Sequence, residues 1–113
     1  MIILTISVNA RSSKRNELLS ACRLITDQTR QESGCKSSQL SQDNDNKNII
    51  TLEQQWEQRS FLNDYFRSDH FSALFGAMKL LGRTYDIRIN GGNQKEGLEA
   101  VQMARSKADM SDQ

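Results

Sequence analysis

The sequence predicts an α+β domain whose strands and helices follow the order β-α-β-β-α-β. Two patterns carry this prediction. Apolar and polar residues alternate with a period of two near both ends of the region 2–89, which is typical of half-buried strands. Between them, apolar residues recur every three or four positions over 18–29 and 61–81, which is typical of amphipathic helices. The length of 113 residues suits one domain.

The chain opens with the alternating pattern, and Asn9 is expected to end this first strand. The apolar members of the pattern are Ile2, Leu4, Ile6 and Val8. Ser12 or Ser13 is expected to cap the helix that follows, because a serine hydroxyl accepts a hydrogen bond from a free N–H of the first turn. Gly34 is expected to end that helix near residue 33.

A hairpin follows the first helix. Residues 35–42 predict a polar strand and 48–56 a second strand, and the DNDN of the intervening loop supplies turn-forming side chains. The alternating acids of this loop also suggest calcium. That reading is disfavoured because the loop lacks the sixth-position glycine and the closing glutamate of an EF-hand.

The second helical region runs from about residue 58 to Leu81 and is expected to break near Ser68 and Asp69. Gly82 ends it. Alternation over 84–89 predicts the fourth strand, which the glycine pair Gly91 and Gly92 ends. Residues 1–92 then form one domain, and 93–113 form a polar tail. A weak apolar stripe in this tail, which suggests a short helix, consists of Leu98, Val101 and Ala104.

This order is the ferredoxin-like arrangement, with a four-stranded antiparallel sheet and both helices on one face. The other face presents mostly polar side chains, such as Thr5, Ser7, Asp86 and Arg88. That face can meet water. It can also pair with the same face of a second copy, and the low hydrophobic fraction of 36% favours such a homodimer.

Composition and charge exclude several classes of protein. With 15 basic and 14 acidic residues the formal net charge is +1, so no overall field attracts nucleic acid or an anionic membrane. The apolar start of the chain is too short to span a bilayer. Cys22 and Cys35 fit neither a disulfide framework nor a zinc site, and reduced thiols predict a cytoplasmic protein.

Three segments, in this order, resemble the antibiotic biosynthesis monooxygenase (ABM) family. They are RQESGC at 30–35, ITLEQQWEQRSFLNDYFRSDHFSAL at 50–74 and YDIRI at 85–89. The resemblance implies a dimeric α+β barrel, in which two ferredoxin-like sheets face each other. It also implies a cofactor-independent oxygenase that acts with molecular oxygen on a phenol, quinol or polyketide-like aromatic. Related proteins degrade haem or isomerise small sugar-derived signals, so the fold alone does not assign the reaction.

The match is uneven when it is followed residue by residue. Trp56 falls on the family's tryptophan and His70 on the histidine of its S-x-H-F motif. Tyr65 replaces an earlier helix histidine, and Gln54 stands where the family has a strand glutamate, with Glu53 one place before it. Haem cleavage is disfavoured, because Tyr65, Phe75 and Ile6 fall on that branch's tryptophan, histidine and asparagine.

Four residues are the candidates for a site. His70 is the candidate catalytic base, because imidazole is the side chain that titrates near neutral pH; the alternative is a helix cap or a structural histidine. Trp56 can stack on an aromatic substrate, Tyr65 can donate to a substrate oxygen and Asn9 can hold one. Packing in the core, for Trp56 and Tyr65, and turn capping, for Asn9, are the alternatives. Neither a metal nor a cofactor is expected.

Three functions fit this sequence. The first is a cofactor-independent monooxygenase of the ABM type, in which a general base deprotonates the substrate. The second is a dimeric binding module that has kept the fold and lost the chemistry. The third is an isomerase of small hydroxyketones, which needs the same base and no oxygen.

Overall fold

A computed structural model describes residues 1–91 and 94–111, and it confirms the ferredoxin-like α+β fold. Five antiparallel strands form one sheet in the order β2-β3-β1-β4-β5. Their bounds are β1 Ile2–Ala10, β2 Cys35–Gln42, β3 Ile49–Trp56, β4 Gly82–Gly91 and β5 Gln94–Glu96. The first four are the predicted strands.

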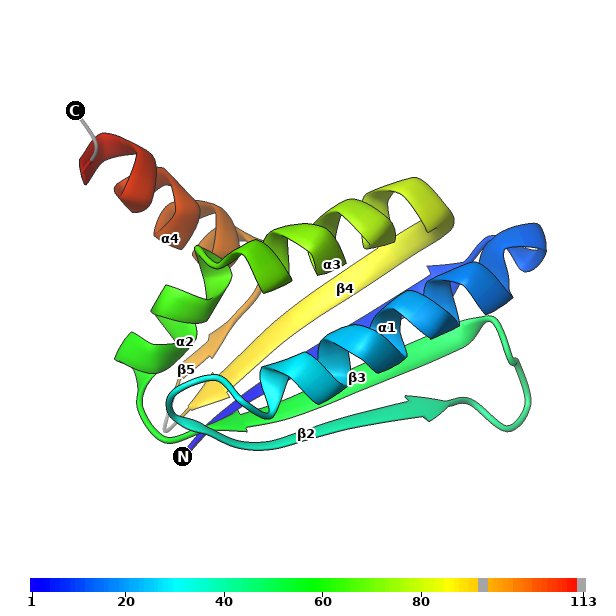
Figure 1. Ribbon diagram of the computed structural model, residues 1–113, viewed down its shortest axis with the longest axis horizontal. Coiled ribbons are helices and arrows are strands. Elements are labelled where there is room, and N and C mark those ends of the chain that lie inside the picture. Colours follow the sequence, from blue (N-terminus) through cyan, green and yellow to red (C-terminus); the bar gives the residue numbers. More distant parts are fainter. Residues whose placement is uncertain (92–93, 112–113) are drawn as a thin grey trace.

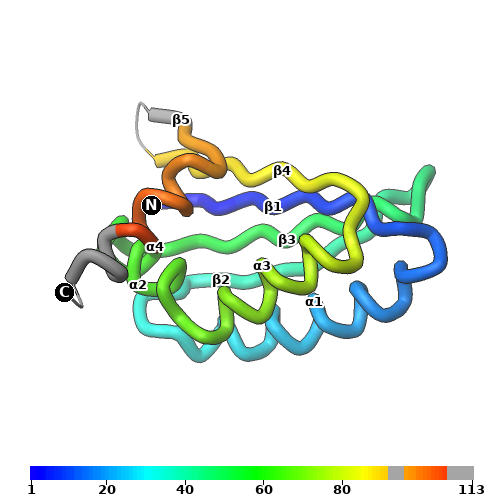
Figure 2. Tube along the Cα trace, turned by 90° about the horizontal axis from the view of Figure 1, so that it is seen from above, coloured from blue at the N-terminus to red at the C-terminus, as the bar shows by residue number. Residues whose placement is uncertain are grey.

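The helices cover one face of the sheet (Figures 1 and 2). Their bounds are α1 Arg15–Thr29, α2 Arg59–Phe66, α3 Asp69–Leu81 and α4 Leu98–Ser111, and a short 3₁₀ helix, η1, spans Ser12–Lys14. The helix α1 packs beside α3, and α4 packs against α2 and β4 at one end of the molecule. None of the helices in the described ranges is long and apolar enough to cross a membrane.

The core lies between the sheet and the helices. In β1 the residues at even positions, from Leu4 to Ala10, are buried, as the alternation predicts, and the odd positions are half-buried on the opposite face. Strand β1 is central, since it pairs with β3 on one side and with β4 on the other. The largest fully buried side chains include Trp56, Tyr65, Phe66 and Phe71.

The predicted break in the second helical region is confirmed between α2 and α3. Ser68 caps α3: its Oγ accepts a hydrogen bond from the backbone N–H of Phe71 (3.1 Å) and donates one to the carbonyl of Tyr65 (2.6 Å). The cap explains why two short helices replace one long helix, because a residue in extended conformation cannot continue a helix. His70 is thereby placed in the first turn of α3.

Three details differ from the expectations. Neither Ser12 nor Ser13 caps α1, because both lie in η1; the Oγ of Ser12 instead accepts a hydrogen bond from the side-chain amide of Asn48 (2.9 Å). The helix α1 ends at Thr29, and Gly34 follows in a turn with φ +82°. Gly82 is the first residue of β4.

The C-terminal region was predicted as a polar tail with a short helix. The helix is present as α4, whose apolar stripe packs on the core through Ala100, Val101 and Ala104. The strand β5 was not predicted, because its three polar residues carry no alternation of apolar side chains. The expected strand end at Gly92, and the boundary drawn after it, lie outside the described residues.

Candidate functional site

A continuous chain of buried hydrogen bonds links β3, α2 and α1. The indole Nε1 of Trp56 donates to Oε1 of Gln54 (3.2 Å), and Nε2 of Gln54 donates to the hydroxyl of Tyr65 (3.3 Å). The Tyr65 hydroxyl lies 3.2 Å from Oγ1 of Thr29, which itself donates to the carbonyl of Ile25 (2.7 Å). The four side chains are at most 2% exposed. This chain holds two of the four candidate residues.

The direction of every proton in this chain follows from valence. The indole can only donate, so it fixes the amide of Gln54 with its oxygen toward Trp56 and its nitrogen toward Tyr65. Thr29 has one hydroxyl proton, which it gives to Ile25. Tyr65 must therefore donate its own proton to Thr29 while it accepts from Gln54. The phenol is fully occupied in this state.

The surroundings of Tyr65 keep it in the neutral form. Burial raises the pKa of Tyr65 above its usual value, and the hydrogen bonds with Thr29 and Gln54 oppose this rise. Its ring lies 4.9 Å from the Trp56 ring and meets Phe71 edge to face at 5.4 Å. These contacts fill the space between the sheet and α2 with aromatic side chains.

His70 forms a pair with Glu32 at the surface beside this chain. Its Nδ1 lies 2.8 Å from Oε1 of Glu32, and the two side chains are 43% and 28% exposed. Glu32 belongs to the turn after α1, only three residues beyond Thr29. Its charge contributes to the raised pKa of Tyr65, after burial. The pair and the buried chain therefore lie at the same end of the molecule.

The pair sets the chemistry that His70 can perform. A carboxylate only accepts hydrogen bonds, so Nδ1 of His70 carries the proton that faces Glu32. In the neutral ring this leaves Nε2 with a free lone pair, which is the form that a general base needs.

Asn9 lies apart from the other candidates. It is on the open face of the sheet, near the end of β1 where η1 begins, and it pairs with Ile49 of β3. Trp56 pairs with Ile2 at the other end of β1. Seven residues of strand separate the two positions by about 23 Å. The structure thus brings Trp56 and Tyr65 together, places His70 nearby, and leaves Asn9 remote.

Sequence reasoning missed three members of this arrangement. In the sequence, Thr29 is only the last position of the helical stripe over 18–29, and Gln54 only replaces a glutamate of the family pattern. Glu32 was present in the RQESGC segment, but its partner is 38 residues away, and no short-range spacing connects the two. The RQESGC motif was the one signal in the sequence that pointed to Glu32.

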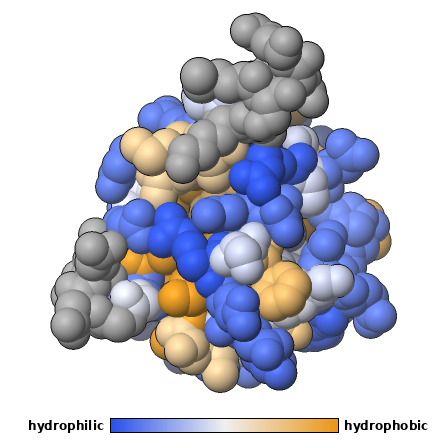
Figure 3. All heavy atoms as spheres, turned by 90° about the vertical axis from the view of Figure 1, so that its left-hand side faces the viewer, coloured by the Kyte–Doolittle hydropathy of each residue, from blue (hydrophilic) through white to orange (hydrophobic). Residues whose placement is uncertain are grey.

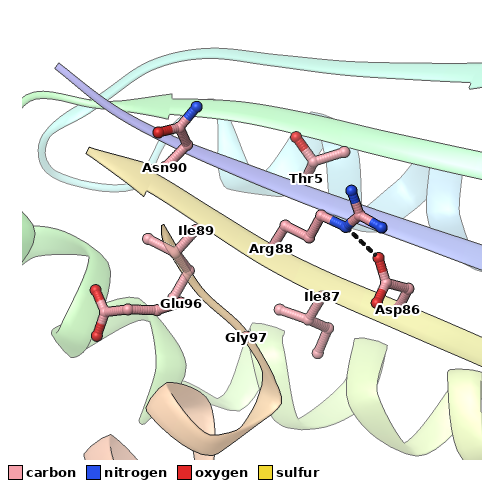
Figure 4. A pocket seen from close by; sticks show the side chains of 8 residues that line it. All are labelled: Thr5, Asp86, Ile87, Arg88, Ile89, Asn90, Glu96 and Gly97. Atoms are coloured by element: carbon pink, nitrogen blue, oxygen red, sulfur yellow. Dashed lines mark hydrogen bonds and ion pairs between the residues drawn. The ribbon is translucent and has the colours of Figure 1, made fainter. Parts of the chain in front are cut away.

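A hollow of about 560 Å³ lies at the edge of the sheet, between β4 and β5 (Figure 4). Thr5, Arg88 and Asn90 line it on the open face, and Arg88 is paired with Asp86 at 2.8 Å. It contains none of the four candidates. Within the ranges 1–91 and 94–111, no three side chains of histidine, cysteine, aspartate or glutamate are grouped to hold a metal ion.

The fold and this site define a small ferredoxin-like α+β protein with a surface histidine–carboxylate pair. Residues 1–77 match the family model described as antibiotic biosynthesis monooxygenase. The chain belongs to the antibiotic biosynthesis monooxygenase family. No match was found among the curated proteins.

Several solved structures share this fold. The crystal structure of an antibiotic biosynthesis monooxygenase is 18% identical to this protein. The alignment covers 83% of this chain and 100% of that chain, with a TM-score of 0.75. A conserved protein from Methanosarcina mazei Go1 is 24% identical, with coverages of 79% and 89% and a TM-score of 0.74. A protein from Mycobacterium tuberculosis is 19% identical, with coverages of 82% and 95% and a TM-score of 0.75. At these identities the likeness shows the fold alone.

Proposed function

We propose that the protein is a cofactor-independent monooxygenase that oxidises a small phenol, quinol or polyketide-like aromatic with molecular oxygen. The pair of His70 and Glu32, 2.8 Å apart, is the observation that carries the proposal. It supplies an oriented base on a chain that belongs to the antibiotic biosynthesis monooxygenase family. The neighbouring Trp56 and Tyr65 supply aromatic surface.

The reaction begins when Nε2 of His70 accepts the phenolic proton. The electron-rich phenolate then reduces oxygen by one electron, and the two radicals combine into a ring peroxide anion. This anion takes back the proton from His70 and becomes a hydroperoxide. Loss of the ring C–H proton to a base and cleavage of the O–O bond release hydroxide and leave a carbonyl. The sum for an anthrol is one oxygen molecule consumed, one quinone formed and one water released. The substrate supplies all of the electrons.

The transfer of the phenolic proton to His70 has a moderate free-energy cost. The ordinary pKa values of a free phenol and a free imidazole differ by about 3.5, so the proton transfer costs about 5 kcal/mol. A polycyclic phenol with a delocalised anion lowers this cost. This effect favours a fused aromatic substrate over simple phenol.

The residues assigned to substrate binding have different places in this proposal. Trp56 and Tyr65 offer ring faces for stacking, once the substrate has entered the space that they fill. Asn9 is left out, because it lies on the opposite face of the sheet.

The proposed oligomer is a homodimer formed through the open sheet faces. Half-buried Ile3, Thr5 and Ser7 run along the middle of this face on the central strand. Asp86 and Arg88 beside them already neutralise each other within one chain. A cytoplasmic location remains a prediction from the sequence.

Oxygen uptake by metal-free protein with a panel of anthrols and naphthoquinols tests the proposed reaction. We expect uptake that falls at least about 100-fold in His70→Gln and about tenfold in Glu32→Gln, because a positioned base contributes roughly 10²–10⁴ to the rate. Asp69→Asn is the matched control, since Asp69 is the exposed neighbour of His70. Turnover that is equal in His70→Gln and the control would refute the role of His70.

A second candidate function is a binding module without chemistry. The complete hydrogen-bonding of Tyr65, which replaces a histidine of the family pattern, favours it. Quenching of Trp56 fluorescence by the same aromatics, without any oxygen uptake, would support this function over the first. Conversion that continues without oxygen would instead indicate an isomerase.

A further inference from the structure

The rings of Trp56 and Tyr65 contact each other in the buried core, and a substrate can stack on either ring only if an element moves. Trp56 is fully buried, and Tyr65 stacks on it from α2. The helix α2 has eight residues, which is too short for a helix to be stable without tertiary contacts. Its position is therefore set by what holds it.

The C-terminal segment holds α2 at both ends. At the first residue of α2, Arg59 forms a two-pronged ion pair with Glu96 of β5. At the last residue, the carbonyl of Phe66 accepts a hydrogen bond from Nη1 of Arg105 in α4 (2.7 Å). Nη2 of Arg105 also donates to Oγ of Ser72 in α3 (3.1 Å).

These two contacts suit a clamp that can open. The carbonyl at a helix C-terminus lacks a partner within the helix and carries the negative end of the helix dipole, so a guanidinium binds it well. Between the two contacts, α4 buries Ala100, Val101 and Ala104, and Leu98 at its first residue packs against the core. The two arginine contacts add polar attachments to this apolar packing, one at each end of α2.

We infer that α4 is a clamp on α2, and that its release lets α2 carry Tyr65 away from Trp56 and opens the interior to an aromatic substrate. The end of the molecule where this happens presents hydrophobic atoms among hydrophilic ones (Figure 3). The entry of substrate rests on the proposed function; the opening itself does not. The two parts can therefore be tested separately.

Acrylamide quenching of Trp56, the only tryptophan of the chain, reports the opening. In Arg105→Met, which loses both hydrogen bonds, we expect the Stern–Volmer constant to rise about threefold or more, with an unchanged far-ultraviolet circular dichroism spectrum. Arg83→Met is the matched control, because Arg83 is exposed on β4. Equal quenching in the two variants would overturn the clamp.

Hydrogen exchange of the unmodified protein tests the clamp without a variant. The amides of α2 and α4 should exchange together, and faster than those of α1 and α3, because the clamp makes them one opening unit. Exchange in α2 as slow as that in α1 would overturn the clamp, even where Arg105→Met fails to fold.

Oxygen uptake separates the clamp from the proposed reaction. Increased quenching in Arg105→Met, with no uptake by any variant, supports the clamp and refutes the reaction. Uptake by the unmodified protein, with quenching unchanged in Arg105→Met, overturns the clamp and supports the reaction.

Discussion

Tyr65 joins two parts of the core that would otherwise be linked only by apolar contact. Its ring packs on Trp56 and Phe71, while its hydroxyl connects Thr29 of α1 with Gln54 of β3. Because the hydroxyl both donates and accepts, its removal leaves the buried Nε2 of Gln54 without this acceptor and Oγ1 of Thr29 without this donor.

The substitution Tyr65→Phe is therefore expected to lower the free energy of unfolding by about 1–3 kcal/mol. Urea unfolding measures this change. Tyr85→Phe is the matched control, since Tyr85 is only half-buried, and its effect should stay within about 0.5 kcal/mol. Equal effects of the two substitutions would show that the buried chain adds nothing to stability.

Cys22 makes stability depend on alkaline pH. Burial raises the pKa of this thiol from 9.0 to about 11. Above pH 9 the unfolded chain loses the proton and the folded chain keeps it, so the unfolded state binds fewer protons and the free energy of unfolding falls as pH rises.

From pH 9 to pH 10.5 this thiol should lower the free energy of unfolding by about 1.5 kcal/mol. In Cys22→Ala that contribution is absent, so the stability advantage of the unmodified protein should shrink by this amount over the interval. Urea unfolding of both proteins at the two pH values measures it. If the difference in the free energy of unfolding between the two proteins does not change with pH, the raised pKa of the Cys22 thiol is refuted.

At the scale of elements, the turn between α1 and β2 depends on Gly34. Its φ of +82° lies in the left-handed region, and a Cβ added there would overlap the ring of Phe61. The carbonyl of the same residue accepts the backbone N–H of Glu57 (2.8 Å), so the turn fastens the end of β3 as well. The turn also carries Glu32, the partner of His70.

The substitution Gly34→Ala is expected to destabilise the protein by at least about 1–3 kcal/mol, through backbone strain and the overlap with Phe61. Gly76→Ala is the contrasting control. Gly76 lies inside α3 with open space around it, so alanine there should stabilise by about 0.5–1 kcal/mol. Thermal unfolding compares them, and equal shifts of Tm in one direction would contradict this account of the turn.

Elements with a strong period were predictable from the sequence, and the others were not. The buried and exposed faces of β1 follow directly from its alternation. The strand β5 pairs with β4 but was not predictable in this way, because its three residues are all polar and show no apolar alternation. The start of α1 was also missed, since a 3₁₀ turn took the serines that were expected to cap it.

For the site, residue types could be predicted and partners could not. The aromatic residues around Tyr65 were visible as a group, and the motif resemblance singled out His70. The place of Asn9 on the open face follows from the alternation of β1, whereas the partnership of Glu32 with His70 depends on long-range pairing. Such pairing leaves no local trace in one sequence.

At the scale of the whole molecule, the open sheet face is the expected dimer interface. Light scattering after gel filtration should give a mass of twice 12.9 kDa, about 26 kDa. Ser7→Lys places a charge at the middle of this face and should give a monomer, because an unpaired charge is costly to bury. Leu80→Lys, on the exposed surface of α3, should remain a dimer. A monomer for the unmodified chain would refute the pairing.

The one-way hydrogen-bond chain through Tyr65 also discriminates between oxidation states. Any group that takes the place of the phenol must accept from Gln54 and donate to Thr29. A hydroxyl does both, whereas a carbonyl can only accept, which leaves the oxygen of Thr29 without a donor. The loss of this hydrogen bond costs roughly 1–3 kcal/mol, so a quinone would bind about ten to a hundred times more weakly than its quinol. If the proposed quinol occupies this position, we expect its oxidised product to leave more readily than the quinol.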